Sequence, residues 1–300
     1  MPRRELSGKR VLVTGASQGI GYALAVSAAR RGCKVVAAAR SGELLDKLAA
    51  EVRGTGGEIT TVVADVTDPA GRAAMFAACE RQYGGLDVLV NNAGIGATGH
   101  FMETRPETLR QIFEVNVFAT AEMIREGLPL LRRGSQPLIV NVSSVFGRRG
   151  YPARSLYSSS KFAIQGLSDA IRAELSKDGV GVLVVNPGLT QTNFSQNMLE
   201  RSARISLDHK RGSTPEQVAE ATWAAAAADK SEVTLTLNGK LLVFVNRFVP
   251  WVFELFARRK IRKLFADEIA ARQATTPLPP TPLPGGVGAG PPQHERERGV

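Results

Sequence analysis

The sequence is poor in metal-binding and redox-active side chains. Its 300 residues include only two cysteines, Cys33 and Cys79, and three histidines. None of them has the close spacing of a metal site, so we expect no metal centre. One cysteine lies beside a strand-like run and the other in a helix-like run, far apart in the chain. This placement predicts two buried, reduced thiols and no disulfide.

The sequence also lacks a long uncharged apolar run at its start. The first strand-like run begins at residue 10, which leaves no room before it for a signal peptide or an N-terminal membrane span. We therefore expect a cytoplasmic protein. No internal repeat is present in the sequence.

Aromatic residues are scarce, at 6% of the chain, and the net charge of +10 is scattered. Basic residues cluster at positions 2–4, 132–133, 148–149 and 258–263. None of these clusters is interleaved with the aromatic side chains that stack on RNA bases, so nucleic acid is not expected as a partner. An anionic membrane surface suits this charge better.

The chain is built from alternating strand-like and helix-like segments. The strand-like runs span residues 10–14, 34–39, 59–64, 86–90, 138–142, 180–185 and 232–237. They are almost continuously apolar, as in parallel strands that are covered by helices on both faces. Right-handed crossovers then predict an α/β fold, a three-layer, Rossmann-type, doubly wound parallel sheet of about seven strands. Its ligand crevice would lie at the carboxyl ends of the strands.

A glycine-rich turn follows the first strand-like run, with the sequence Thr-Gly-Ala-Ser-Gln-Gly-Ile-Gly at residues 14–21. Glycines at these positions permit a tight turn and a close approach of the backbone to phosphate, and the N-terminus of the next helix attracts anions. A purely structural turn is the alternative interpretation. The position between the first strand and the first helix of a β-α-β unit favours a dinucleotide site.

Tyr157 and Lys161 are four residues apart in a helix-like segment. Residues at this spacing share one helix face, so the ammonium group can lie beside the phenol. A nearby cation favours the phenolate and lowers the pKa of a tyrosine, which makes the pair suited to acid–base chemistry on a carbonyl or an alcohol. An ordinary pair of solvated helix neighbours is the alternative.

Several further motifs occur in a fixed order, and together they resemble the short-chain dehydrogenase/reductase family over residues 8–237. The turn at residues 14–21 matches the cofactor turn of that family, and Asn-Asn-Ala-Gly at residues 91–94 matches its fourth-strand motif. Asn116 lies in the expected helix, Ser144 precedes Tyr157 by 13 residues, and Pro-Gly-Leu-Thr-Gln-Thr follows at residues 187–192.

The resemblance implies catalytic roles for four residues. Tyr157 would be the general acid in carbonyl reduction and the base in alcohol oxidation, while Ser144 would hold the substrate oxygen. Lys161 would lower the pKa of Tyr157 and bond to the nicotinamide ribose. In similar enzymes the residue that corresponds to Asn116 bends its helix and fixes a water molecule. Ser143 could be mistaken for the catalytic hydroxyl, but neighbours on a strand point to opposite sides and the spacing selects Ser144.

The resemblance also assigns residues to the cofactor. They are Gly15, Ser17, Gln18, Gly19, Ile20, Gly21, Arg40, Asp65, Val66, Asn92, Ala93, Gly94, Tyr157, Lys161, Pro187, Gly188 and Thr192. Asp65 would contact the adenine, although the segment 65–68 could equally cap the following helix, and both can be true. Asn91 and Asn92 could simply bond to backbone at the strand end.

The second strand-like run ends at Arg40, where an NAD enzyme usually carries an acidic residue for the ribose hydroxyls. A guanidinium group suits the 2′-phosphate of NADP(H), which we therefore expect as the cofactor in preference to NAD(H). Many similar NADP-dependent proteins carry a second basic residue in the turn, where this chain has Gln18. A surface Arg40 without a ligand is the alternative.

The C-terminal part has a different composition. The lid at residues 193–213 is polar and basic, and residues 239–265 are rich in aromatic residues and end in a basic cluster. Arg247, Pro250 and Glu254 break this segment too often for a transmembrane span. A helix at a membrane interface fits it, as does a cover for the substrate cleft or a contact with a second subunit.

We accordingly expect three parts: a Rossmann-type domain at residues 1–238, an aromatic and basic helical extension at 239–273, and a disordered Pro/Gly-rich tail at 274–300. The extension resembles those of membrane-associated family members that reduce lipid, steroid or retinoid carbonyls. The resemblance implies an oxidoreductase acting on a bulky hydrophobic carbonyl or alcohol, in the cytoplasm and in peripheral contact with a membrane through residues 240–265. A homodimer or homotetramer is common among similar proteins. A 3-oxoacyl or 3-ketosphinganine reductase, or a catalytically silent dinucleotide-binding regulator, are the competing functions.

Overall fold

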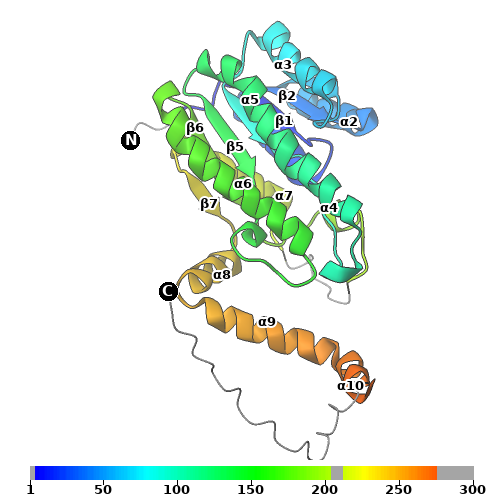
Figure 1. The fold of residues 1–300 in the computed structure, drawn as a ribbon. Helices are drawn as coiled ribbons and strands as arrows, with labels where there is room; N and C mark the ends of the chain where they lie inside the picture. The colour runs from blue at the N-terminus through cyan, green and yellow to red at the C-terminus, as the bar shows by residue number, and fades with distance from the viewer. Residues whose placement is uncertain (1–3, 204–211, 276–300) are drawn as a thin grey trace, which may run out of the picture. The chain divides into compact units, whose positions relative to one another are not determined.

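The computed structural model describes the backbone of residues 4–203 and 212–275. In these residues seven strands form one parallel sheet, in the order β3-β2-β1-β4-β5-β6-β7 (Figure 1). The strands are β1 (Arg10–Thr14), β2 (Lys34–Ala39), β3 (Glu58–Val63), β4 (Val88–Asn91), β5 (Leu138–Val142), β6 (Gly181–Asn186) and β7 (Glu232–Thr234). The predicted doubly wound α/β fold is confirmed.

Helices cover both faces of the sheet. On one face lie α1 (Gly19–Arg30), α2 (Gly42–Gly54) and α7 (Pro215–Ala227), around a core that contains Leu24, Leu48 and Trp223. On the other face lie α3 (Pro69–Tyr83), α5 (Ala119–Arg132) and α6 (Ser155–Glu174), around a core that contains Met75 and Met123. Figure 1 shows α5 and α6 in front of the sheet and α7 behind it. The order of the strands reverses between β1 and β4, and in such sheets the ligand crevice opens at the carboxyl ends beside that reversal.

At the opposite, amino-terminal edge of the sheet, Asp87 ties three strands together. Its carboxylate accepts hydrogen bonds from Arg10 N, Arg10 Nε and Arg10 Nη2 at 2.9, 2.9 and 2.7 Å, and from Ser135 N at 2.6 Å. The backbone of Asp87 bonds to Arg10 O and to Leu138 N, at the starts of β1 and β5. Burial alone would raise the pKa of Asp87, but the bonds from Arg10 and Ser135 lower it below its ordinary value.

Strand β7 is three residues shorter than the sequence predicted, because a helix begins sooner. Thr236 is the N-cap of α8 (Leu237–Phe248), and its side chain accepts a hydrogen bond of 3.0 Å from Gly239 N. A cap of this kind satisfies one of the free N–H groups at a helix start and stops the extended backbone.

The compact fold continues to Arg258, and residues from Arg259 form a second unit. Helix α9 (Pro250–Leu264) begins in the first unit and ends in the second, which also contains α10 (Ala266–Thr275). Residues 274 and 275, which were expected to belong to the disordered tail, are helical. The rest of that expected tail, at 276–300, lies outside the described residues. Within the part of the chain that the structure describes, every helix is too short or too polar to traverse a bilayer.

Candidate active site

The glycine-rich turn connects β1 to α1 and makes the tight turn that the sequence predicted. Gly15 and Gly19 have φ values of +64° and +60°, in the left-handed region that favours glycine. Gly21 is needed for space instead: a Cβ atom there would lie 2.3 Å from Gly15 O and 2.4 Å from Asn92 Nδ2. The first turn of α1 has neither an acidic residue nor a side-chain cap, so its N–H groups are free to face an anion.

The end of β4 holds this turn in place. Asn92 Nδ2 donates hydrogen bonds to Thr14 O and Gly15 O at 2.9 and 3.1 Å. Thr14 Oγ1 accepts from Asn92 N at 3.0 Å and from Ala93 N at 3.1 Å. Asn91 points elsewhere and donates to Asn141 Oδ1 at 2.9 Å. Asn92 thus bonds to backbone, as the sequence interpretation allowed, and it also lines the adjacent cavity.

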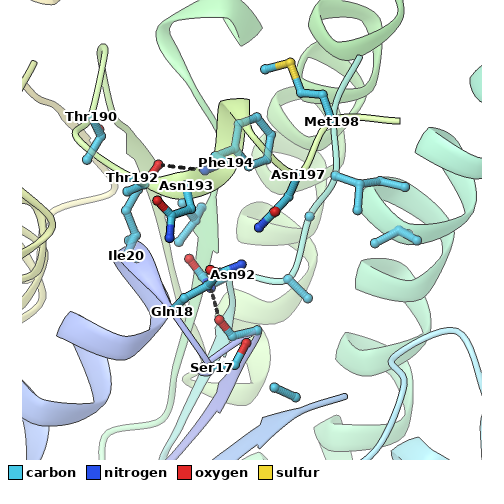
Figure 2. A pocket seen from close by; sticks show the side chains of 18 of the residues that line it. Ser17, Gln18, Ile20, Asn92, Thr190, Thr192, Asn193, Phe194, Asn197 and Met198 are labelled. Atoms are coloured by element: carbon cyan, nitrogen blue, oxygen red, sulfur yellow. Dashed lines mark hydrogen bonds between the residues drawn. The ribbon is translucent and has the colours of Figure 1, made fainter. Parts of the chain in front are cut away.

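A cavity of about 470 Å³ runs along the carboxyl ends of the central strands. All of the residues predicted to contact the cofactor line it, apart from Gly21, which lies beneath the turn. Figure 2 shows Ser17 and Gln18 of the turn and Asn92, which follows β4. They lie opposite side chains of the loop after β6, including Asn193 and Phe194. The candidate catalytic residues Ser144, Tyr157 and Lys161 line the same cavity.

Tyr157 and Lys161 both lie on α6, as predicted. Lys161 is buried, its Nζ donates to Val142 O at 2.9 Å, and it lies 5.7 Å from the centroid of the Tyr157 ring. The sequence predicted a lowered pKa for Tyr157, and the structure shows a raised one. Burial raises the pKa of Tyr157 to about 12, and a bond with Ser144 and the charge of Arg154 lower it only in part. Burial also lowers the pKa of Lys161 to about 8, because desolvation disfavours its charged form.

The two neighbouring serines have different partners. Ser143 Oγ donates to Lys161 O at 3.2 Å and accepts from Gln165 Nε2 at 3.1 Å, which fixes it against α6. Ser144 Oγ accepts from Phe146 N at 3.1 Å and also bonds with Tyr157. Both serines line the cavity, and Ser144 is the one whose hydroxyl bonds with the phenol.

Asn116 lies at a break in a helix. A five-residue π-helical turn at Glu114–Phe118 separates α4 (Pro106–Phe113) from α5, and Asn116 is buried within it. Its Nδ2 donates to Ile95 O and Ser160 Oγ at 2.9 and 3.0 Å, while its Oδ1 accepts from Ile95 N at 2.9 Å. Asn116 is not a lining residue of the cavity; it connects α6 to the segment after β4.

At the other end of the cavity Arg40 is exposed, with its Nη1 3.7 Å from Asp65 Oδ2. Asp65 Oδ1 accepts from Thr67 N and Thr67 Oγ1, both at 2.9 Å, and closes a local turn. The N-cap of α3 is Asp68, which accepts from Ala70 N and Gly71 N. The segment therefore caps the helix through Asp68 and lines the cavity through Asp65.

The structure adds lining residues that the sequence did not single out. The lid contributes Asn193, Phe194 and Met198, among others, and the loop before α6 contributes Arg154. The Phe194 ring lies 5.5 Å from the Tyr157 ring, centroid to centroid. Lid residues 204–211 lie outside the described residues. Arg154 stands three residues before Tyr157, which was the available indication that its side chain could reach the site.

Comparison with known proteins agrees with this geometry. A family model described as short chain dehydrogenase matches residues 9–203, more than half of the chain. The chain belongs to the short-chain dehydrogenase/reductase family. A relative from Anopheles gambiae, Dehydrogenase/reductase SDR family protein 7-like, is 31% identical over 271 residues, which cover 87% of this chain and 86% of the relative. Membership of this family makes the chain an oxidoreductase by class.

Solved structures of short-chain dehydrogenases/reductases share the fold. A member from Burkholderia phymatum, in complex with NAD, has a TM-score of 0.75 and 26% identity, over 81% of this chain and 94% of that one. An alcohol dehydrogenase from Thermococcus sibiricus, complexed with 5-hydroxy-NADP, has a TM-score of 0.69 and 26% identity, over 76% of this chain and 96% of that one. These two similar structures thus hold NAD in one case and 5-hydroxy-NADP in the other, and the cofactor preference of this chain depends on its own residues.

Proposed function

We propose that the protein is an NADP(H)-dependent oxidoreductase that interconverts a carbonyl and an alcohol, with Tyr157 as the general acid and base. The convergence of Ser144, Tyr157 and Lys161 on the cavity beside the glycine turn carries this proposal. Ser144 comes from the segment after β5, and Tyr157 and Lys161 come from α6. All three line the cavity next to the glycine turn, whose backbone suits a dinucleotide.

The pKa of about 12 fits a proton donor. Tyr157 is protonated at neutral pH and can donate its proton to a substrate oxygen as negative charge develops there. Ser144 shares that position and can donate a second hydrogen bond to the same oxygen. Lys161, whose pKa is about 8, is mostly charged at neutral pH and stabilises the phenolate that remains after proton transfer. In the oxidation direction the same groups act in reverse.

The residues present fit a dinucleotide. The free N–H groups of α1 and the positive φ of Gly15 and Gly19 form a cradle for its pyrophosphate. The end of the cavity where the adenine would lie is lined by Asp65 and Val66. The end near Tyr157 is lined by Gly94, Pro187, Gly188 and Thr192. When bound, NADP(H) supplies or accepts the hydride. This chain's own part is to hold the cofactor, orient the substrate and move the proton.

Arg40 is proposed to select the cofactor. Its side chain is 72% exposed and lines the cavity beside Asp65, where a 2′-phosphate could replace the carboxylate as its partner. We expect Arg40→Asp to shift the ratio of kcat/KM for NADPH over NADH by about tenfold or more toward NADH, because a hydrogen bond to a charged group contributes about 1.5–3 kcal/mol. Arg81→Asp, at an exposed position on α3, is the matched control. An unchanged ratio in Arg40→Asp would refute this role.

The substrate is proposed to have a bulky hydrophobic body, as a lipid, steroid or retinoid has. The cavity walls near Tyr157 support this, since Ile95, Phe146, Leu189 and Phe194 are among the lining residues. The test is NADPH oxidation with a panel of steroid, retinoid and aromatic carbonyls, a 3-oxoacyl thioester and 3-ketosphinganine. Turnover of the last two alone would favour the rival reductases. NADPH binding without turnover of any compound would favour a silent regulator and defeat the enzymatic proposal.

The C-terminal extension is proposed to contact the cytoplasmic face of a membrane. On α8, Leu241, Phe244 and Phe248 recur at helical spacing and are 59–63% exposed. On α9, Trp251 and Phe256 are 66% and 70% exposed. The sequence of α9 then ends in five basic residues within positions 258–263, which suits anionic headgroups.

Flotation with liposomes tests this contact. We expect the full chain to float with phosphatidylserine-containing vesicles at low salt, and a variant with serine at Phe244, Phe248 and Phe256 to remain at the bottom of the gradient. The control carries Phe101→Ser and Met102→Ser, which remove exposed apolar side chains elsewhere. The proposal fails if the full chain does not float or if the first variant floats equally well. A dimer that the same triple variant dissociates would identify the apolar surface as a subunit interface instead.

A further inference from the structure

Arg154 is a buried cation that lines the substrate end of the cavity. It occupies the N-cap position of α6, three residues before Tyr157, and is only 8% exposed. Its side chain makes a 3.0 Å hydrogen bond from Nη1 to Met198 Sδ, a weak acceptor on the lid. Among the described residues, no carboxylate lies within ion-pairing distance of this guanidinium.

The other buried arginines of the chain show what is unusual about this one. Arg4, also 8% exposed, pairs with Asp229 at 3.0 Å and donates to two backbone carbonyls. Arg72, 6% exposed, pairs with Glu126 at 2.9 Å and donates to Val66 O. Buried charges in proteins are normally paired in this way, because removal from water is costly. In the part of the chain described here, Arg154 is about as buried as these two arginines. Its side-chain partner is the thioether of Met198, whereas each of the other two is paired with a carboxylate.

The cavity itself offers no compensating charge near Arg154. Asp65 is the one acidic residue among the described lining residues, and it bonds to Thr67 and faces Arg40 at the opposite, cofactor end. Burial lowers the pKa of Arg154, with the neighbouring tyrosines Tyr157 and Tyr151 acting in the other direction. The N-terminus of α6, a helix of 20 residues, adds a second favourable field for an anion at this position.

We propose that Arg154 is the subsite for a carboxylate on the substrate. This inference rests on the proposed function and specifies its substrate class: an oxo acid whose apolar chain lies against the cavity wall and whose carboxylate meets the guanidinium while the reacting carbonyl meets Tyr157. A planar guanidinium donates two parallel hydrogen bonds to a carboxylate, a geometry that a thioether cannot match. Binding of the acid would displace Met198 Sδ from Arg154, so the lid would respond to the acid group.

A role in tuning Tyr157 alone predicts a different kinetic signature. The charge of Arg154 lowers the pKa of Tyr157, so loss of that effect would change kcat and the pH profile equally for acids and for neutral ketones. Loss of a carboxylate subsite would instead raise KM for oxo acids and leave KM for their methyl esters unchanged. A comparison of 4-oxo and 5-oxo acids with their methyl esters therefore separates the two roles.

The test begins with binding, which needs no turnover. Octanoate and octanamide are titrated calorimetrically into the full chain saturated with NADPH. We expect octanoate to bind at least about tenfold more tightly than octanamide to the wild type, and this preference to disappear in Arg154→Met. Arg154→Lys, which keeps the charge without the planar fork, should retain part of it. Arg110→Met is the matched control, since it removes one positive charge from an exposed position on α4 next to the lining residue Gln111.

Equal affinity of the wild type for octanoate and octanamide, or binding of neither, would overturn the proposal. So would an acid preference that persists in Arg154→Met. If Arg154→Met fails to bind NADPH or to fold, the comparison rests on Arg154→Lys, where an unchanged preference would contradict the role of the planar fork and a partial loss would support it. NADPH binding and reduction of the neutral panel are measured on the same wild-type preparation. Reduction of neutral ketones without acid preference would leave the proposed function standing and defeat only the carboxylate subsite.

Discussion

Replacing Tyr157 with phenylalanine is expected to lower kcat for carbonyl reduction by about 10²–10⁴-fold, the range typical of a lost general acid. The variant loses one hydroxyl, so the cavity keeps its shape and the aromatic contact with Phe194 remains. NADPH affinity should stay within about twofold, because the turn and the end of β4, which form the cradle, are untouched. The measurement is steady-state reduction of whichever panel compound is turned over, together with NADPH binding by fluorescence.

The matched control for this experiment is Tyr151→Phe. It removes the hydroxyl of another tyrosine near the site, one that packs on Phe146 and Phe253 and is not among the described lining residues. We expect its kcat to remain close to that of the wild type. If Tyr157→Phe kept a tenth or more of the wild-type kcat, the proton would have to come from another group and the proposed mechanism would be wrong.

Replacing Asp87 with asparagine is expected to lower the free energy of unfolding by about 3 kcal/mol at neutral pH. The Arg10 side chain is 22% exposed and that of Asp87 only 4%. Removal of the acidic partner from such a largely buried ion pair leaves the arginine charge without compensation, which is more costly than the net contribution of the pair. Here Asp87 accepts four hydrogen bonds, three of them from Arg10, at the edge where β1, β4 and β5 begin. Urea denaturation at neutral pH measures the effect.

The pH dependence of the stability difference between wild type and Asp87→Asn tests whether the carboxylate charge causes it. The pKa of Asp87 is lowered in the folded protein, so its contribution is present above the unfolded pKa of about 3.9 and is lost as pH falls through the folded value. The difference in stability between wild type and Asp87→Asn should therefore be constant near pH 7 and shrink below about pH 4. Asp46→Asn, at an exposed position on α2, is the control and should change stability little at either pH. A pH-independent difference would mean that the carboxylate charge is not its source.

The sheet was predictable because each strand is specified locally. Apolar runs between helix-like segments placed β1, β2 and β5 with the bounds that the structure shows. The end of β7 was not predictable in this way, since the run stays apolar at Leu235 while the cap formed by Thr236 starts α8. That competition between an extended run and a helix cap is decided by hydrogen bonds that an apolar pattern does not encode.

The candidate site was predictable to the same extent. Tyr157 and Lys161 share a helix face through a fixed local spacing, and parallel topology brings Ser144 and the glycine turn to the same edge of the sheet. The pKa of Tyr157 was not predictable, because its rise depends on desolvation by every element packed around the phenol. The burial of Arg154 was missed for a similar reason: its side-chain partner, Met198, is 44 residues away in the chain.

The hydrogen bonds of Asn92 to the glycine turn affect how a nucleotide would be captured. Because Thr14 and Gly15 are already held by a side chain from the neighbouring strand, the loop becomes ordered when the protein folds and not when a ligand arrives. Less conformational entropy is then lost on association, which improves affinity without any additional contact. In Asn92→Ala the entropy lost on ordering the loop would be lost on nucleotide binding and not on folding. The loop would then adopt its binding conformation only when the nucleotide binds.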